Sequence, residues 1–331
     1  MNLDEAYRSV STWLKRCHRP LVLSHQRPDG DSLGAMAAMV HVLERYGCRP
    51  VPMLFEPPPP AYRVLRDCAQ WPIWSQHADE ILGQCDAVVI VDTCALAQLE
   101  PAVEYLRDAP PTLVIDHHAT RDAIGVRPGD LRVLDETAAA VCVLIAEWMR
   151  GAPVAFDEKV AAALFVGIAT DCGWFRFSNT DDRTLRVAAE LVRHGAAPAH
   201  LYDAIYQQDA PARVRLIGRM LSRLELHAGG KLAVLTLRPA DFEAVGADPS
   251  MAYDLVNEAG RLGCTEATLL FTQQPDGTIR VNLRSKRVLD VAALARRYGG
   301  GGHARAAGAT LRGEWDVVVP RLIQETCDLL H

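Results

Sequence analysis

Carboxylates and imidazoles follow apolar runs at four places in the first half of the chain. The four segments are His25-Gln-Arg-Pro-Asp29-Gly-Asp31, Val91-Asp92-Thr93, Ile115-Asp116-His117-His118 and Gly167-Ile-Ala-Thr-Asp171. Carboxylates suit Mg²⁺ or Mn²⁺ as ligands, and a minority of imidazoles shifts the preference toward Mn²⁺. So many of these groups at the ends of buried strands indicate a site that gathers hard cations. We therefore interpret the N-terminal half as a two-metal phosphoesterase.

The first two segments each leave a structural alternative open. A loop can direct Asp29 and Asp31 toward different cations, but aspartates in such a turn can also bond their own backbone. Asp92 ends an apolar strand, where a carboxylate is costly to bury unless a cation or a donor meets it. It is a candidate bridging ligand between two metals. The alternative is a helix N-cap for the segment after Thr93.

Of the other two segments, Asp116-His117-His118 is the more specific. In Asp116-His117-His118, one histidine can ligate metal while the next faces substrate, and Asp116 can orient a ring. The alternative is a core histidine whose hydrogen bonds are satisfied within the fold, and this alternative fits two adjacent histidines less well. Asp171 follows an apolar helix, where a carboxylate is unfavourable against the helix dipole and so favours a cationic partner. Arg176 could be that partner without any metal.

The elements around these segments predict an α/β domain built on a parallel sheet. The runs 87–91 and 112–115 are continuously apolar, as in strands covered on both faces. In open α/β sheets, ligands lie beyond the carboxyl ends of the strands. We therefore expect the four segments to share one site. Further strands are expected at 21–24 and 51–55, and helices at 3–16, 33–46, 138–149, 157–170 and 182–194.

The pattern of expected helices and strands changes after about residue 225. A strand at 232–237, a helix at 252–262 and a hairpin of 267–272 with 278–283 predict a second, smaller α/β domain. Its most unusual stretch is Gly299–Gly308, where four consecutive glycines let backbone N–H groups approach a ligand closely. We expect a catalytic domain at 1–195, a helical linker at 196–225 and a substrate-binding domain at 226–331, with a cleft between the two domains.

Composition limits the classes of partner. A chain of 331 residues predicts two domains, and its net charge of −6 argues against a protein that coats long nucleic acid. Short anionic substrates remain open, because the segment 284–305 holds six Lys and Arg residues against Asp290 alone. Nine cysteines without a C-x-x-C pair fit no disulfide framework. No run is long enough to cross a membrane and no signal peptide is recognised, so we expect a cytoplasmic protein.

Taken together and in this order, the four segments resemble the motifs of the DHH phosphoesterase superfamily. The glycine-rich stretch resembles that of the DHH-associated C-terminal domain, and the two resemblances cover nearly the whole chain. Length and the sequence Phe175-Arg176-Phe177-Ser178-Asn179-Thr180 are most similar to the nano-RNase/pAp-phosphatase branch. The chain departs from that branch at Cys172, where Thr is common, and after Thr93, where a Gly-Asp pair is usual.

The resemblance implies the role of each site residue. His118 would lie beside the scissile phosphate, with Asp116 also in the catalytic group. One cation would be held by His25, Asp29 and Asp92, and a second by Asp31, Asp92, His117 and Asp171. Positions that bind substrate phosphate are matched by Arg284, Ser285, Gly301, Gly302 and His303.

The resulting hypothesis is an enzyme with two divalent cations, Mn²⁺ before Mg²⁺, that hydrolyses short oligonucleotides such as pApA or pGpG to mononucleotides. The resemblance adds pAp 3′-phosphatase activity, and we allow for a homodimer. One rival is a pyrophosphatase-like hydrolase of another small phosphate substrate, which would not need the glycine-rich stretch. The other is a catalytically idle nucleotide-binding sensor, whose mark would be the loss of metal ligands.

Overall fold

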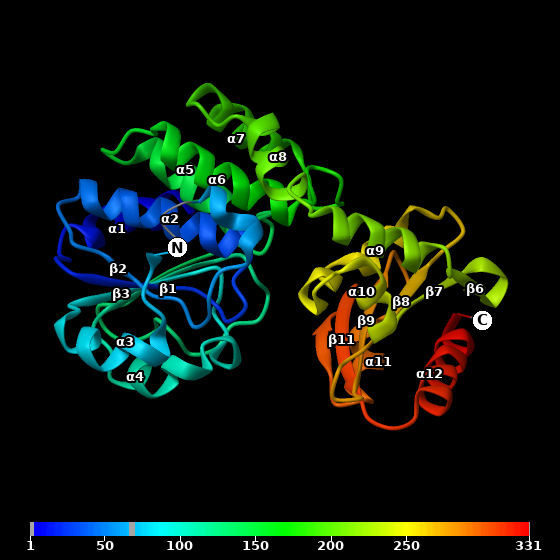
Figure 1. Ribbon diagram of the computed structural model, residues 1–331. Coiled ribbons are helices and arrows are strands. Elements are labelled where there is room, and N and C mark those ends of the chain that lie inside the picture. The colour runs from blue at the N-terminus through cyan, green and yellow to red at the C-terminus, as the bar shows by residue number, and fades with distance from the viewer. Residues whose placement is uncertain (1–2, 66–69, 331) are drawn as a thin grey trace. The chain divides into compact units, whose positions relative to one another are not determined.

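The computed structural model describes residues 3–65 and 70–330, with the side chain of His303 left out (Figure 1). The chain divides into two compact units, Met1–Gln208 and Asp209–His331. The boundary between them falls within the segment expected as a linker. That segment contains helix α8 (Pro198–Tyr206) in the first unit and helix α9 (Pro211–Leu221) in the second.

The first unit is built on a five-stranded sheet in which every pairing is parallel, with the order β2-β1-β3-β4-β5. The inner strands are entirely buried, which explains their unbroken apolar sequences. Since the order brings β1, β3 and β4 side by side, the residues after them emerge at one edge of the sheet. The strands are β1 (Pro20–Leu23), β2 (Val51–Pro52), β3 (Ala87–Val91), β4 (Thr112–Asp116) and β5 (Leu131–Leu134).

Helices cover both faces of this sheet, as Figure 1 shows. The larger core lies under α1 (Leu3–Leu14), α2 (Gly30–Arg45), α5 (Val141–Gly151), α6 (Glu158–Asp171) and α7 (Asp182–Arg193). The other face is covered by α3 (Trp74–Ile81), the short α4 (Val103–Arg107) and 3₁₀ turns at 82–84, 96–98 and 100–102. A further 3₁₀ turn, Pro60–Val64, packs against α8.

Five details of the sequence-based prediction are wrong. Helix α2 begins three residues earlier than expected, at Gly30, because Asp29 is its N-cap. The strand expected at 51–55 is only two residues long, and Leu54 forms an isolated bridge with Ile73 instead of pairing with β1. The edge strand β5 was not expected, since only Val133 within it is fully buried. Helix α5 begins three residues later than expected. The helix expected at 252–262 is two 3₁₀ turns, Pro249–Ala252 and Leu255–Arg261, separated by Asp254 in the left-handed region.

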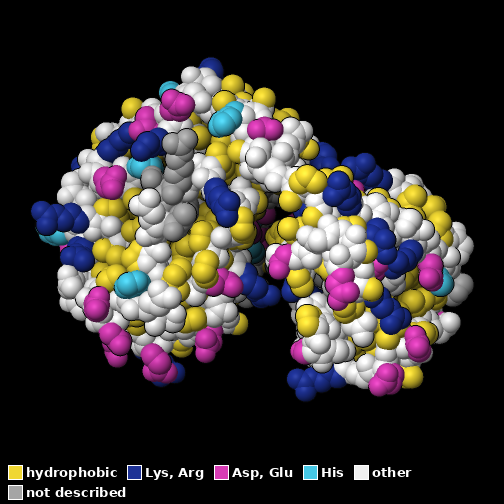
Figure 2. Space-filling model, viewed as in Figure 1, with side chains coloured by type: hydrophobic (Ala, Val, Ile, Leu, Met, Phe, Trp, Pro, Cys, Tyr) yellow, Lys and Arg dark blue, Asp and Glu magenta, His cyan; other side chains and the backbone are white. Residues whose placement is uncertain are grey.

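The second unit holds a six-stranded sheet with the order β10-β11-β9-β8-β7-β6, in which only β7 and β8 pair in parallel. Helices α11 (Val291–Arg296) and α12 (Trp315–Leu330) pack on one face. Helices α9 and α10 (Pro239–Val245) pack on the other, and Lys and Arg side chains gather over α9 (Figure 2). The strands are β6 (Glu225–His227), β7 (Leu232–Leu237), β8 (Ala267–Gln273), β9 (Ile279–Ser285), β10 (Gly301–His303) and β11 (Ala306–Leu311).

None of the described helices combines the length and the apolar composition needed to cross a bilayer.

Asp241 on α10 is expected to be important for the stability of the second unit. Its buried carboxylate accepts hydrogen bonds from Arg238 N at 2.9 Å, Arg223 Nη1 at 2.8 Å and Arg219 Nε at 3.2 Å. Asp241→Ala would leave these donors without their acceptor and should lower the free energy of unfolding by about 3 kcal/mol. Urea unfolding measures the loss. Glu243→Ala, an exposed change on the same helix, should stay within about 0.5 kcal/mol, and equal effects of the two would contradict the account.

Candidate metal centre

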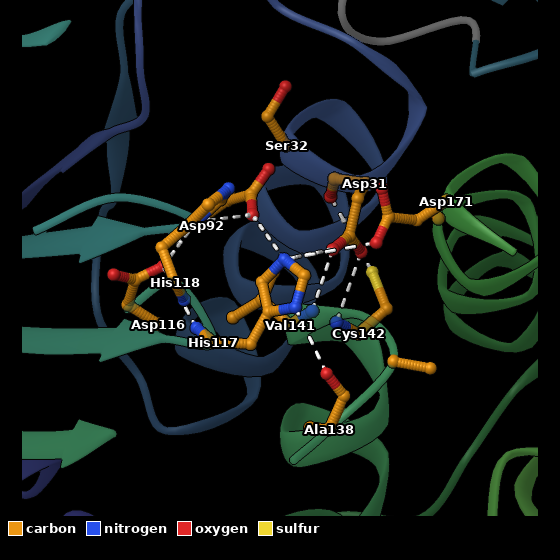
Figure 3. Close-up of polar contacts among 12 residues, drawn as sticks. Asp31, Ser32, Asp92, Asp116, His117, His118, Ala138, Val141, Cys142 and Asp171 are labelled. Carbon is orange, nitrogen blue, oxygen red and sulfur yellow. Dashed lines mark hydrogen bonds and ion pairs between the residues drawn. The ribbon is translucent and has the colours of Figure 1, made fainter. Parts of the chain in front are cut away.

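The residues that follow three neighbouring strands meet at the carboxyl edge of the parallel sheet. His25 follows β1, Asp92 follows β3, and His117 follows β4. Their side chains converge: His25 Nε2 lies 3.2 Å from Asp92 Oδ2, and His117 Nε2 lies 3.4 Å from Asp92 Oδ1. Figure 3 shows the part of this cluster around His117. Three segments separated by more than twenty residues each therefore form one site, as the sheet order requires.

Asp92 is central to the cluster, and its backbone is unusual. Its φ angle is +64°, in the left-handed region that non-glycine residues rarely adopt. The residue is 2% exposed, and its Oδ1 accepts no hydrogen bond from any described residue. The next helical turn, at 96–98, begins at Ala95 without a side-chain cap, so the N-cap alternative for Asp92 is wrong. A buried carboxylate oxygen without a hydrogen-bond donor is suited to bind a cation.

Asp29 and Asp31 stand at the start of α2 and have different surroundings. Asp29 caps the helix, because its Oδ1 accepts from the backbone N–H groups of Asp31 and Ser32 at 3.0 Å. The turn expected as an alternative is thus present, and the same Oδ1 also lies 3.9 Å from His25 Nε2. Asp31 is buried and accepts from Val141 N at 2.6 Å and Cys142 N at 3.1 Å, at the start of α5.

Asp171 reaches the cluster from the C-terminal end of α6. Its Oδ2 lies 3.9 Å from His117 Nε2, and Asp31 Oδ2 lies 3.8 Å from the same nitrogen. Arg176, the alternative partner, instead donates from Nε to Gly173 O at 2.6 Å. The carboxylate at this helix end therefore faces the cluster of candidate ligands.

The donor set fits two divalent cations. His25 and His117 each direct Nδ1 to a backbone carbonyl, Gln26 O at 2.8 Å and Ala138 O at 3.1 Å, which leaves Nε2 facing the carboxylates. Metal-binding histidines are typically oriented in this way. Three overlapping groups have ligand atoms within 4.8 Å of one another: His25, Asp29 and Asp92; Asp31, His117 and Asp171; and Asp92, His117 and His118. Asp92 is in two of them, as a bridging carboxylate would be.

His118 is oriented by Asp116 rather than by a backbone carbonyl. Asp116 is fully buried, and its Oδ1 accepts from His118 Nδ1 at 2.8 Å and from the backbone N–H groups of His117 and His118. This hydrogen bond raises the pKa of His118, although burial opposes it. In its protonated form the histidine would carry a second N–H donor at Nε2.

The charges of the cluster shift the pKa values of its members in the metal-free protein. Burial lowers the pKa of His117, but its close contact with Asp92 and the charges of Asp31 and Asp171 outweigh the effect of burial and raise the pKa to about 10. Burial also lowers the pKa of His25, but the contact with Asp92 outweighs burial and raises this pKa to about 9. Burial raises the pKa of Asp171 to about 7 despite His117 nearby. Near neutral pH, protons thus occupy nitrogens that a cation would need.

Comparisons with known proteins agree with this geometry. A model described as the DHH family, N-terminal domain, matches residues 19–168, and a model of the DHHA1 domain matches residues 229–330. A bifunctional oligoribonuclease and PAP phosphatase NrnA from Thermus thermophilus is 31% identical over 313 residues, which are 93% of this chain and 89% of the relative. The chain belongs to the DHH family. The family expected from the order of the motifs is therefore confirmed.

Two further similarities extend across the DHH and DHHA1 domains. The Bacillus subtilis protein named bifunctional oligoribonuclease and PAP phosphatase NrnA is 29% identical, and the alignment covers 88% of each chain. The crystal structure of an exopolyphosphatase-related protein from Bacteroides fragilis has a TM-score of 0.90 at 18% identity and covers 98% of this chain and 96% of its own. The second similarity concerns the fold alone. The expected α/β fold class is confirmed.

In the DHHA1 domain, the expected substrate-binding residues lie on β9 and β10. Arg284 is on β9, and Ser285 Oγ donates to Leu289 O at 2.6 Å. Gly301 has open space where a side chain would begin, whereas a Cβ at Gly300 or Gly302 would overlap the backbone of β11. Two of the four glycines are thus required by strand packing. His303 pairs through its backbone with Ala306, and its side chain lies outside the described part of the chain.

Sequence reasoning missed the groups that hold the ligands of the DHH domain in place. The backbone N–H groups of Val141 and Cys142 fix Asp31, and Gly167 leaves room for it. Asn179 Nδ2 donates to Ala139 O at 3.2 Å and to Asp171 O at 3.3 Å, so it ties the end of α6 to the segment before α5. Backbone donors have no sequence signal, but Asn179 lies in the stretch that carried the family resemblance.

The affinity of the DHH domain for Mn²⁺ is expected to rise with pH. A cation must displace the protons of His25 and His117, so each displaced proton should change the affinity by about tenfold per pH unit between about pH 6 and 8. In the metal-free protein, the contribution of these histidines to the stability of the fold falls as the pH rises, opposite to the trend in affinity. The raised histidine pKa values stabilise the fold below about pH 6.5, and this contribution is lost as the pH rises through about 9 to 10.

Calorimetric titration with Mn²⁺ in two buffers of different ionisation enthalpy measures both the affinity and the protons released. Thermal melts of the metal-free chain over the same range measure the opposite trend in stability. A constant affinity with no proton release would contradict the prediction.

Proposed function

We propose that this DHH-family protein is a two-metal phosphodiesterase that hydrolyses short oligonucleotides to mononucleotides, with Mn²⁺ as the preferred cation. The observation that carries the proposal is Asp92, a buried carboxylate between His25 and His117 with one oxygen left without a donor. The substrate class is supported by the two relatives named as bifunctional oligoribonuclease and PAP phosphatase. On the same ground we propose pAp as a further substrate.

In this mechanism the candidate ligands at the edge of the parallel sheet would hold two cations. His25, Asp29 and Asp92 would hold one cation, and Asp31, Asp92, His117 and Asp171 the other. Such a pair supplies an acidic water and neutralises charge on the phosphate. Asp31 is oriented by the N-terminus of α5, whose N–H groups favour a negative charge. Burial and the charges of Asp92 and Asp171 raise its pKa in the metal-free chain, and a bound cation would oppose that rise. Asp92 lies between the two histidines and faces each of them with a different carboxylate oxygen.

His118 and Asp116 would act on the substrate itself. Asp116 accepts from Nδ1 of His118 and so fixes the ring with Nε2 available to the phosphate. Because its pKa is raised, His118 is suited to donate a hydrogen bond to a phosphate oxygen or a proton to the leaving oxygen. Within the DHHA1 domain, a phosphate group would be bound by Arg284, Ser285, His303 and the amides of Gly301 and Gly302.

The test is a product time course on labelled di- to pentanucleotides and on pAp, with Mn²⁺, Mg²⁺ or EDTA. We expect the fastest release of mononucleotides from the shortest substrates with Mn²⁺ and none with EDTA. Nucleotide binding without any Mn²⁺-dependent product would instead indicate an idle sensor. Hydrolysis of pyrophosphate in preference to pApA would indicate the other rival.

A further inference from the structure

Arg284 is held in one orientation by residues that are distant in the sequence. Its Nε donates to Asn257 Oδ1 at 3.1 Å, its Nη1 donates to Leu283 O at 3.1 Å, and its Nη2 lies 3.4 Å from Asp254 Oδ1. Asn257 and Asp254 are on the segment before β8, on a different part of the DHHA1 domain from β9. Each of the three guanidinium nitrogens therefore contacts one acceptor within the chain.

The segment that carries these two residues is itself firmly anchored. Asp254 adopts a left-handed conformation with φ of +59° and precedes the 3₁₀ turn Leu255–Arg261. Leu255 and Val256 are buried in the core under α9 and α10. From α9, Arg213 donates to the carbonyl oxygens of Met251 and Tyr253. The position of both partners of Arg284 is thus set by the core of the domain.

The two partners differ in charge and in geometry. Asn257 is neutral and makes the shorter contact, on Nε. Asp254 is an acidic residue with a 45% exposed side chain; burial raises its pKa, and the charge of Arg284 opposes that rise. Its longer contact is on Nη2, a nitrogen that a phosphate would also use. We propose that Asn257 is a positioning residue that orients Arg284, and that the Asp254 carboxylate is an internal anion that substrate phosphate displaces from Nη2. This inference rests on the proposed function.

The two roles predict opposite effects on substrate binding. Asn257→Ala frees the guanidinium group, so the KM for pApA should rise about tenfold, with kcat within about twofold. Asp254→Asn removes the competing charge while keeping a residue that tolerates the left-handed conformation. It should lower the KM about threefold. A residue with a merely structural role would not lower the KM when it is replaced.

The experiment measures kcat and KM on pApA with Mn²⁺, and the Kd for fluorescently labelled pApA in EDTA, using the full chain. The matched control is Asp248→Asn, an exposed helix cap on the same segment that should change neither quantity. A raised KM for Asp254→Asn, or an unchanged KM for Asn257→Ala, would overturn the inference.

Arg284→Ala separates this inference from the proposed function. If this variant raises the KM and the Kd while the other two do not, the inference alone fails. If wild-type chain forms no product, the proposed hydrolysis fails, and the Kd values in EDTA still test the two roles. If neither product nor binding is observed, both fail.

Discussion

Asp92→Asn is expected to lower the turnover of pApA by about a thousandfold or more while the chain stays folded. A two-metal site supplies several kcal/mol of transition-state stabilisation, and each 1.36 kcal/mol corresponds to a factor of ten in rate. Asp92 is the carboxylate that faces both His25 and His117, so its loss affects both candidate cation sites. No other carboxylate in the cluster makes close contacts with two histidines through separate oxygens, among the residues that the structure describes.

Asparagine is the sharpest replacement at this position for a physical reason. The φ angle of +64° is tolerated by asparagine but costs alanine energy, so Asp92→Asn preserves the backbone and removes only the charge. The loss of that charge should also lower the pKa of His117, because Asp92 is a main cause of its rise.

Rates on pApA with saturating Mn²⁺, together with thermal melts, measure the effect. Asp181→Asn is the matched control, since Asp181 caps α7 away from the cluster and asparagine caps equally well. An Asp92→Asn variant with rates close to wild type would refute the proposed metal centre.

The positions of the candidate ligands could be predicted because they follow from strand geometry. Asp92 and His117 end apolar strands that had to be parallel and buried, and the carboxyl ends of such strands share one edge. Asp171 could be included because a carboxylate at a helix end is unfavourable without a cation. These arguments need only the local sequence and the rule that ligands bind at the carboxyl ends of the strands in an open α/β sheet.

The supports of the site could not be predicted because they depend on contacts between distant segments. Asp31 is held by backbone groups 110 and 111 residues away, and the start of α5 was itself misplaced by three residues. Arg284 depends on Asn257 across 27 residues, in a segment expected to be a regular helix. Neither backbone donors nor a left-handed turn at an aspartate leaves a periodic signal in the sequence.

Gly167→Ala is expected to reduce activity by about a hundredfold, although it adds a single methyl group in a helix. Gly167 lies in α6, which packs closely against α2 and α5. A Cβ there would overlap Cys142 Sγ and lie 2.7 Å from Asp31 Oδ1. Either Asp31 or the start of α5 must move, and a displacement of about 1 Å near a reacting centre costs about a hundredfold in rate. Overpacking should also lower the free energy of unfolding by about 1–3 kcal/mol.

Two further variants identify which contact is responsible. Gly151→Ala adds the same methyl group at the end of α5, where nothing lies within 4 Å, and should leave the rate unchanged. In the double variant Gly167→Ala/Cys142→Ala, the sulfur is removed but the carboxylate remains in contact with the new methyl group.

We therefore expect the double variant to recover most of the stability but only part of the activity, as measured by urea unfolding and by rates on pApA. Full recovery of activity would mean that Asp31 does not need its position at the N-terminus of α5. That result would also mean that the packing of α6 at Gly167 does not control the position of Asp31, although the structure places the two in direct contact.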